Sequence, residues 1–181
     1  MLCNLVEKKT VKCHEYWNSK QNNFSNFEIN FSEKKINKFL IYRNITLKHI
    51  ESEVSKEINQ LHFIGWPDHG APEIEDVYDT FEIMLKQVDL VNKNQAEGVQ
   101  SPIVIHCSAG VGRTGTFITM YNIYYWINKQ LDINKSNVVG FNIWNTVRKL
   151  KEQRLLLVEN ILQYKFIYSF VSHYVTKIFK K

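Results

Sequence analysis

The feature that most constrains the fold is the stretch from Ser101 to Phe117, SPIVIHCSAGVGRTGTF. Its first apolar run, Pro102 to Ile105, is rich in β-branched residues and predicts a buried strand. A loop with three glycines follows, and the uninterrupted segment from Thr116 to Leu131 predicts a helix. A strand, a glycine-rich turn and a helix N-terminus in this order aim backbone N–H groups and a positive helix dipole at one point. The stretch therefore predicts a cradle for a phosphate dianion.

Cys107 and Arg113, which lie within this loop, would make the cradle reactive. The N–H donors around the Cys107 sulfur favour thiolate over thiol and lower its pKa below the free value of about 8.5. Arg113 offers a planar fork of donors to two phosphate oxygens, most strongly in the transition state. Thr114 puts a hydroxyl near the sulfur, where it eases departure of the thiolate from a phosphocysteine. His106 is expected to hold the loop by hydrogen bonds rather than to accept protons.

A dinucleotide site is the alternative interpretation of the same loop. Gly110 to Gly115 satisfies G-x-G-x-x-G, and Asp132 follows at a spacing that suits a ribose contact. That fold would need Asp132 to end a second parallel strand, whereas the preceding residues, YYWINKQL, are typical of the end of a helix. An isolated buried cysteine is often only a small apolar residue, but the neighbouring histidine and arginine favour chemistry at Cys107.

The segment from His106 to Gly115, HCSAGVGRTG, resembles the phosphate-binding loop of the protein tyrosine phosphatases position for position. Trp66 to Gly70, WPDHG, resembles the mobile acid loop of that family. Further similar segments, in the family's order, are NLVEK at 4–8, KCHEYW at 12–17 and VRKLKEQR at 147–154. On these segments the chain is identified as a member of the non-receptor class of this family, with the resemblance covering nearly all of it.

The resemblance implies an α/β (α+β) fold: a twisted mixed β-sheet flanked by helices, in a single partial phosphatase domain over residues 1–181. It implies hydrolysis of phosphotyrosine in proteins through a phosphocysteine intermediate, with no cofactor and no metal. Asp68 would protonate the leaving phenolate oxygen and then act as the base that activates water. Trp66 would serve as a hinge when the acid loop closes.

The resemblance also implies roles for residues around the catalytic group. Glu7 matches the acid that pairs with the loop arginine, and Lys12 matches a lysine that meets the acid loop on closure. The predicted phosphate-binding residues are Ser108, Ala109, Gly110, Val111, Gly112, Arg113, Asp68 and Gln163.

Glu159 departs from the family pattern. The sequence has Val158-Glu159-Asn160-Ile161-Leu162-Gln163 where the family usually has Val-Gln-Thr-x-x-Gln. The first glutamine of the family positions the water that hydrolyses the phosphocysteine. A carboxylate there adds like-charge repulsion, which either slows this second step or is relieved by a proton. We expect Glu159→Gln to speed turnover, and the alternative function is a catalytically impaired, phosphotyrosine-binding decoy.

By the same resemblance the chain begins well inside the usual catalytic domain. The loop that makes the family's pocket deep and tyrosine-selective would precede residue 1, which leaves tyrosine versus dual specificity open. Absent strands would expose apolar surface and an edge, favouring self-association or a non-functional truncated product. Dual-specificity and RNA-triphosphatase activities share the Cys and Arg loop but not usually a Trp-Pro-Asp loop, so Asp68 argues against them.

Composition bounds the remaining possibilities. A chain of 181 residues with 44% hydrophobic residues suits one domain, and three scattered cysteines favour a reducing compartment over a disulfide framework. No signal peptide is recognisable, so a cytoplasmic location is expected. The net charge of +5 is dispersed, which favours a solvated basic face over nucleic-acid binding. Polar residues within Thr116–Leu131 indicate a core helix and no membrane insertion.

Asn, Lys and Ile are heavily used throughout the chain, as expected for an AT-rich genome. With the phosphatase resemblance, this composition is similar to that of the tyrosine phosphatase-like proteins of bracoviruses. The narrower resemblance implies a viral protein in the host cytoplasm that interferes with host cell signalling.

Periodicity predicts the other elements. Short apolar alternations predict antiparallel strands at 24–31 and 37–50, and a further strand at 60–66. A helix is expected from Pro72 with an apolar stripe that includes Phe81 and Val88. Ser136 is expected to cap a helix that buries Val139, Ile143, Val147 and Leu150, and the last helix is expected at about 160–179.

Overall fold

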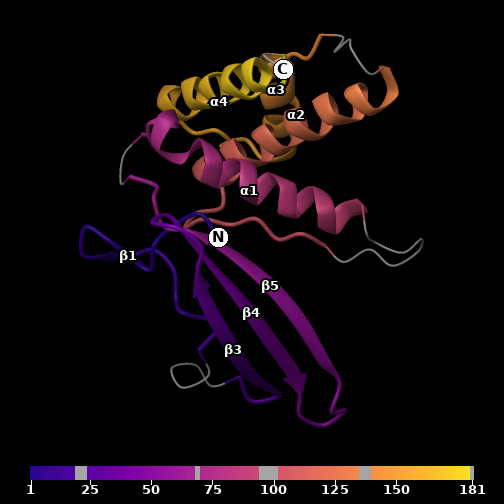
Figure 1. The fold of residues 1–181 in the computed structure, drawn as a ribbon. Coiled ribbons are helices and arrows are strands. Elements are labelled where there is room, and N and C mark those ends of the chain that lie inside the picture. Colours follow the sequence, from indigo (N-terminus) through magenta and orange to yellow (C-terminus); the bar gives the residue numbers. More distant parts are fainter. Residues whose placement is uncertain (19–23, 68–69, 94–101, 135–139, 180–181) are drawn as a thin grey trace. The chain divides into compact units, whose positions relative to one another are not determined.

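The computed structural model describes residues 1–18, 24–67, 70–93, 102–134 and 140–179. The chain forms two compact units, Met1–Asp68 and His69–Lys181. Among the described residues the first unit contains all the strands and the second all the helices (Figure 1). Each unit has a core of its own. Trp17, Leu40 and Phe63 are fully buried in the first, and Phe81 and Ile167 in the second.

The first unit contains a hairpin and a twisted antiparallel sheet. The hairpin joins β1 (Val6–Glu7) to β2 (Thr10–Val11), and the sheet has the order β3 (Phe27–Lys35), β4 (Leu40–His49), β5 (Ser55–Phe63). Phe27 pairs with His49, and Leu40 pairs with Phe63. The strand predicted at 37–50 is confirmed as β4, and the strand predicted at 24–31 corresponds to β3, which begins at Phe27 and continues to Lys35. The predicted strand at 60–66 corresponds to β5, which begins earlier and ends at Phe63.

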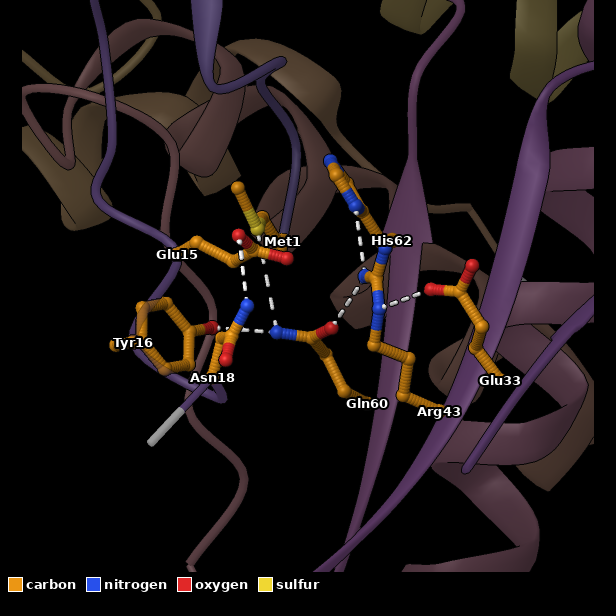
Figure 2. A network of polar contacts seen from close by, with 8 residues as sticks. All are labelled: Met1, Glu15, Tyr16, Asn18, Glu33, Arg43, Gln60 and His62. Atoms are coloured by element: carbon orange, nitrogen blue, oxygen red, sulfur yellow. Dashed lines mark hydrogen bonds and ion pairs between the residues drawn. The ribbon is translucent and has the colours of Figure 1, made fainter. Parts of the chain in front are cut away.

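Arg43 lies at the centre of a polar network on this sheet (Figure 2). Its side chain donates from Nε to Glu33 Oε2 at 2.9 Å and from Nη1 to Gln60 Oε1 at 2.7 Å. Nη1 also lies 2.9 Å from Nδ1 of His62, and His62 Nε2 lies 2.8 Å from the Cys3 carbonyl oxygen. Because a guanidinium can only donate, His62 accepts at Nδ1 and donates from Nε2. The network therefore fixes the tautomer of a buried histidine.

The second unit contains α1 (Ile74–Lys93), α2 (Gly112–Asn134), α3 (Ile143–Gln153) and α4 (Ile161–Phe179). Helix α2 packs against both α3 and α4. The ring of Phe81 on α1 lies 5.4 Å from that of Phe166 on α4, centre to centre. The apolar stripe predicted for α1 is buried except at Val88, which is half-buried. The helix predicted at about 160–179 is confirmed as α4.

Three predictions for this unit need correction or lie outside the described residues. Pro102–Ile105 is not a buried strand: both described sheets lie within residues 6–63, and Val104 is 76% exposed. Without a ladder partner or a covering layer, a β-branched run gains nothing from strand geometry. Helix α2 begins at Gly112, before Thr116, because the glycine loop itself winds into its first turn. Helix α3 begins after Asn142, whose side chain accepts from the Asn145 N–H, whereas Ser136 and Val139 lie outside the described residues.

Candidate active site

The sulfur of Cys107 is the point on which the loop's donors converge. The Thr114 hydroxyl donates to Sγ at 3.2 Å, and the backbone N–H groups of Thr114, Val111 and Gly110 donate to the same atom. Burial of Cys107 by itself raises the pKa of the thiol, because a low-dielectric surrounding disfavours the anion. The hydrogen bonds outweigh burial, so the pKa of Cys107 is lowered from its ordinary value. The site is therefore built to hold a thiolate.

The loop follows this path because of its glycines and the start of α2. Gly110 has φ of +69°, a left-handed conformation that glycine adopts without strain. The Gly115 N–H donates to the Val111 carbonyl at 2.7 Å, which closes the first turn of the helix. Arg113 and Thr114 lie in this first turn, where the helix dipole adds positive potential. Sequence and backbone geometry thus place the donors around one atom.

The segment that joins α3 to α4 packs directly against the start of α2. A Cβ on Gly115 would lie 2.5 Å from the Val158 backbone nitrogen, so only glycine allows this approach. Val158 itself has φ of +57°, which is costly for a β-branched residue. The Lys151 ammonium donates to the Val158 carbonyl at 3.0 Å and helps to hold it. This strained residue sets the position of the next residue, Glu159.

Glu159 and Gln163 lie beside Gly112, at the edge of the cradle. A Cβ on Gly112 would lie 2.8 Å from Glu159 Oε2 and 2.7 Å from Gln163 Nε2. The Glu159 N–H donates to Gln163 Oε1 at 2.9 Å, and Asn160 caps α4 by accepting from the Gln163 N–H at 3.0 Å. Both residues that the sequence singles out near the last helix are therefore at the loop.

His106 and Arg154 contact the loop backbone. Nδ1 of His106 donates to the Cys107 carbonyl at 3.1 Å, as a loop-holding role would require. Burial lowers the pKa of His106, which favours its neutral form. Arg154 Nη2 donates to the Ala109 carbonyl at 3.1 Å. The sequence did not predict this contact. A basic residue at the end of a helix is expected to bond a backbone carbonyl, but the sequence does not indicate which carbonyl.

The remaining predicted residues lie elsewhere. Ser108 and Ala109 are exposed at the tip of the loop in the second unit. In the first unit, Glu7 is buried and accepts from the Asn4 N–H at 3.1 Å, Lys12 is half-buried, and Trp66 packs edge-on against Phe63. Asp68 lies outside the described residues. The structure thus brings Cys107, Thr114, Glu159 and Gln163 to one loop within the second unit.

In the described ranges no group of three or more His, Cys, Asp or Glu side chains is arranged to hold a metal ion. None of the helices in those ranges combines the length and apolar character that crossing a membrane requires.

Comparison with known proteins identifies the family. Residues 1–173 match the family described as protein-tyrosine phosphatase. The chain is 33% identical over 168 residues to human receptor-type tyrosine-protein phosphatase eta, covering 92% of this chain and 12% of the relative. It is 31% identical over 183 residues to tyrosine-protein phosphatase 2 of Dictyostelium discoideum, covering 100% of this chain and 46% of the relative. The chain belongs to the protein-tyrosine phosphatase family.

Solved structures confirm the predicted fold class. The catalytic domain of human protein tyrosine phosphatase non-receptor type 18 matches with a TM-score of 0.70 at 26% identity, covering 95% of this chain and 58% of that one. A structure of the same phosphatase with HER2 phosphopeptides gives 0.74 at 27% identity, covering 95% of this chain and 56% of that one. The chain therefore shares the α+β cysteine-phosphatase fold, and it spans less than half the length of the curated relatives named above.

Proposed function

We propose that the protein hydrolyses phosphotyrosine in proteins through a phosphocysteine intermediate. The Cys107 thiolate attacks phosphorus, the bond to the tyrosine oxygen breaks, and Asp68 gives its proton to that oxygen. Water then attacks the phosphocysteine, Asp68 takes a proton from it, and inorganic phosphate leaves as the thiolate is restored. Arg113 binds two phosphate oxygens through both transition states, and Thr114 stabilises the departing thiolate.

The observation that carries this proposal is the convergence of hydroxyl and backbone donors on the Cys107 sulfur. These donors stabilise the sulfur anion, which is the nucleophile and later the leaving group. The backbone of residues 108–112 supplies further N–H groups for the phosphate, and Gln163 lies beside Gly112 to bind at its edge. The similar human phosphatase has been solved with HER2 phosphopeptides, which supports phosphotyrosyl proteins as the partners.

Glu159 favours a second candidate function, a phosphotyrosine-binding decoy. Its carboxylate lies beside Gly112, where a bound phosphate would meet a like charge. If the second step is slow, the phosphocysteine persists and the protein does not complete its catalytic cycle. The decoy and the phosphatase share the first step and differ in the second.

The cellular setting completes the proposal. The heavy use of Asn, Lys and Ile, together with the resemblance to the bracovirus tyrosine phosphatase-like proteins, supports a viral protein that acts on host signalling in the cytoplasm. The roles that the resemblance implies for Glu7, as the partner of the loop arginine, and for Lys12 and Trp66, at the acid loop, remain predictions. Self-association through an exposed apolar face remains a prediction, to be checked by sedimentation.

The test is release of phosphate from a phosphotyrosyl peptide by the purified protein, with a phosphoserine peptide beside it and Cys107→Ser as the blank. We expect release that depends on Cys107 and prefers phosphotyrosine. One turnover followed by a stable phosphoenzyme in the mass spectrum would instead identify the decoy. A folded protein that neither releases phosphate nor becomes phosphorylated would overturn both.

A further inference from the structure

The peptide unit between Ala109 and Gly110 is held at both of its polar groups. Its carbonyl accepts from Arg154 Nη2 at 3.1 Å, and its N–H donates to the Cys107 sulfur. The carbonyl and N–H of a trans peptide point in opposite directions. Whatever fixes the carbonyl on one side therefore fixes the direction of the N–H on the other.

This peptide unit is one that can turn over. Gly110 lies at φ of +69°, and glycine occupies left-handed and right-handed conformations about equally readily. A rotation of the unit about its own ends would leave the neighbouring residues in place. It would carry the N–H away from Cys107 and bring a carbonyl oxygen toward it, and that oxygen would repel a thiolate. The donor is useful only if the rotation is prevented.

Arg154 is well placed to prevent it. Its backbone is anchored at the end of α3, because its N–H donates to the Leu150 carbonyl at 3.0 Å and its own carbonyl accepts from the Leu157 N–H at 3.1 Å. Its guanidinium also covers the open face of Gly110, with Nη2 3.7 Å from the position of a Cβ. A planar group in this place both bonds the carbonyl and obstructs its movement.

We propose that Arg154 is a positioning residue, which locks the Ala109–Gly110 peptide so that the Gly110 N–H stays directed at the Cys107 sulfur. It acts through the backbone and touches neither the sulfur nor the phosphate. The inference rests on the proposed function only in taking Cys107 as the reactive thiol.

A plain effect of charge has to be separated from this role. Within the described residues of the second unit, the other charged or titratable side chains near the loop are Arg113 and His106 in the loop, Lys151 on α3 and Glu159 before α4. Arg148, on α3 and paired with Glu152, carries the same charge as Arg154 without bonding the loop carbonyl. Arg148→Met therefore removes one positive charge from the same helix and leaves the Ala109–Gly110 peptide held.

The experiment measures the rate of iodoacetamide alkylation of Cys107 against pH, by peptide-resolved mass spectrometry so that Cys3 and Cys13 are counted separately. For Arg154→Met we expect the midpoint of the profile to move up by about one pH unit, as for loss of one hydrogen bond to a charged atom. Arg154→Lys, which can still donate to the carbonyl, should recover most of the shift. Arg148→Met should leave the midpoint in place, and 1 M NaCl should not remove the difference.

The outcomes separate this inference from the proposed function. If wild-type Cys107 alkylates like free cysteine, the proposed function fails. If the wild-type midpoint is low but Arg154→Met and Arg148→Met shift it equally, Arg154 acts by charge and the positioning role is wrong. If Arg154→Met does not fold, Arg154→Lys decides, because its reactivity profile should then lie close to that of the wild type and a full unit's shift would refute the lock.

Discussion

The Arg43 network of the first unit and the Cys107 loop of the second are both built from hydrogen bonds, but the first stabilises the fold and the second stabilises a charge. Around Arg43, the side chains of Glu33, Gln60 and His62 each accept a hydrogen bond from the same guanidinium, so one cation is shared among three acceptors (Figure 2). Around Cys107, several donors share one acceptor, a sulfur that can lose a proton. Matched pairs stabilise a fold, whereas converging donors stabilise a charge. The difference predicts which measurements each region will affect.

The largest effect is expected from Arg43→Met, which removes the centre of the matched network. Gln60 and His62 would keep buried polar atoms without their partner, at a cost of about 3 kcal/mol in the free energy of unfolding. Chemical denaturation measures this loss. Lys48→Met is the control, because its pair with Glu53 is exposed and should contribute under about 0.5 kcal/mol. If both variants lose the same free energy of unfolding, the Arg43 network contributes no more to stability than an exposed ion pair.

Thr114→Val should affect reactivity more than stability. Without the hydroxyl, the pKa of Cys107 rises, so the alkylation profile moves to higher pH by about one unit and phosphate release slows about tenfold. Thr114→Ser keeps the hydroxyl and should retain the wild-type profile. Because the pKa of the Cys107 thiol is lower in the folded protein, its ionisation stabilises the fold at pH values above the pKa of the thiol in the unfolded chain. This stabilisation is lost as the pH falls through the lower pKa of the folded protein. A profile unchanged in Thr114→Val would show that the backbone donors suffice.

Lys9→Gly should stabilise the first unit without touching either polar site. Lys9 has φ of +65° in the β1–β2 hairpin, a conformation that costs a side-chain-bearing residue about 1 kcal/mol. We expect a gain of about that size in the free energy of unfolding. Lys9→Ala removes the charge but keeps the Cβ, so a similar gain in Lys9→Ala would attribute the effect to charge.

Glu159→Gln is expected to give the smallest effect, a rise in steady-state turnover of about threefold, the size expected for removing a partly screened like-charge contact. The gain should appear in hydrolysis of the phosphocysteine, so the pre-steady-state burst should be smaller relative to the steady-state rate. Glu152→Gln, an exposed carboxylate on α3, is the matched control. No gain in Glu159→Gln would mean that the carboxylate beside Gly112 does not limit hydrolysis.

Sequence reasoning found the elements whose signals are local. The apolar periodicity of α4 and the alternation of β4 depend on residues within the element, and both were predicted closely. Pro102–Ile105 was predicted wrongly, because a strand also needs a partner that no local pattern supplies. Arg154 and Arg43 were missed for the same reason: each has partners distant in sequence, at Ala109 and at Gln60.

The close approach of Gly115 to Val158 has a consequence for motion. With 2.5 Å between the Val158 nitrogen and the place where a Gly115 side chain would begin, α2 and the 157–159 segment leave no room for sliding past each other. We therefore expect the backbone of the cradle and the backbone that carries Glu159 to move as one body, so that a displacement of either one displaces the other.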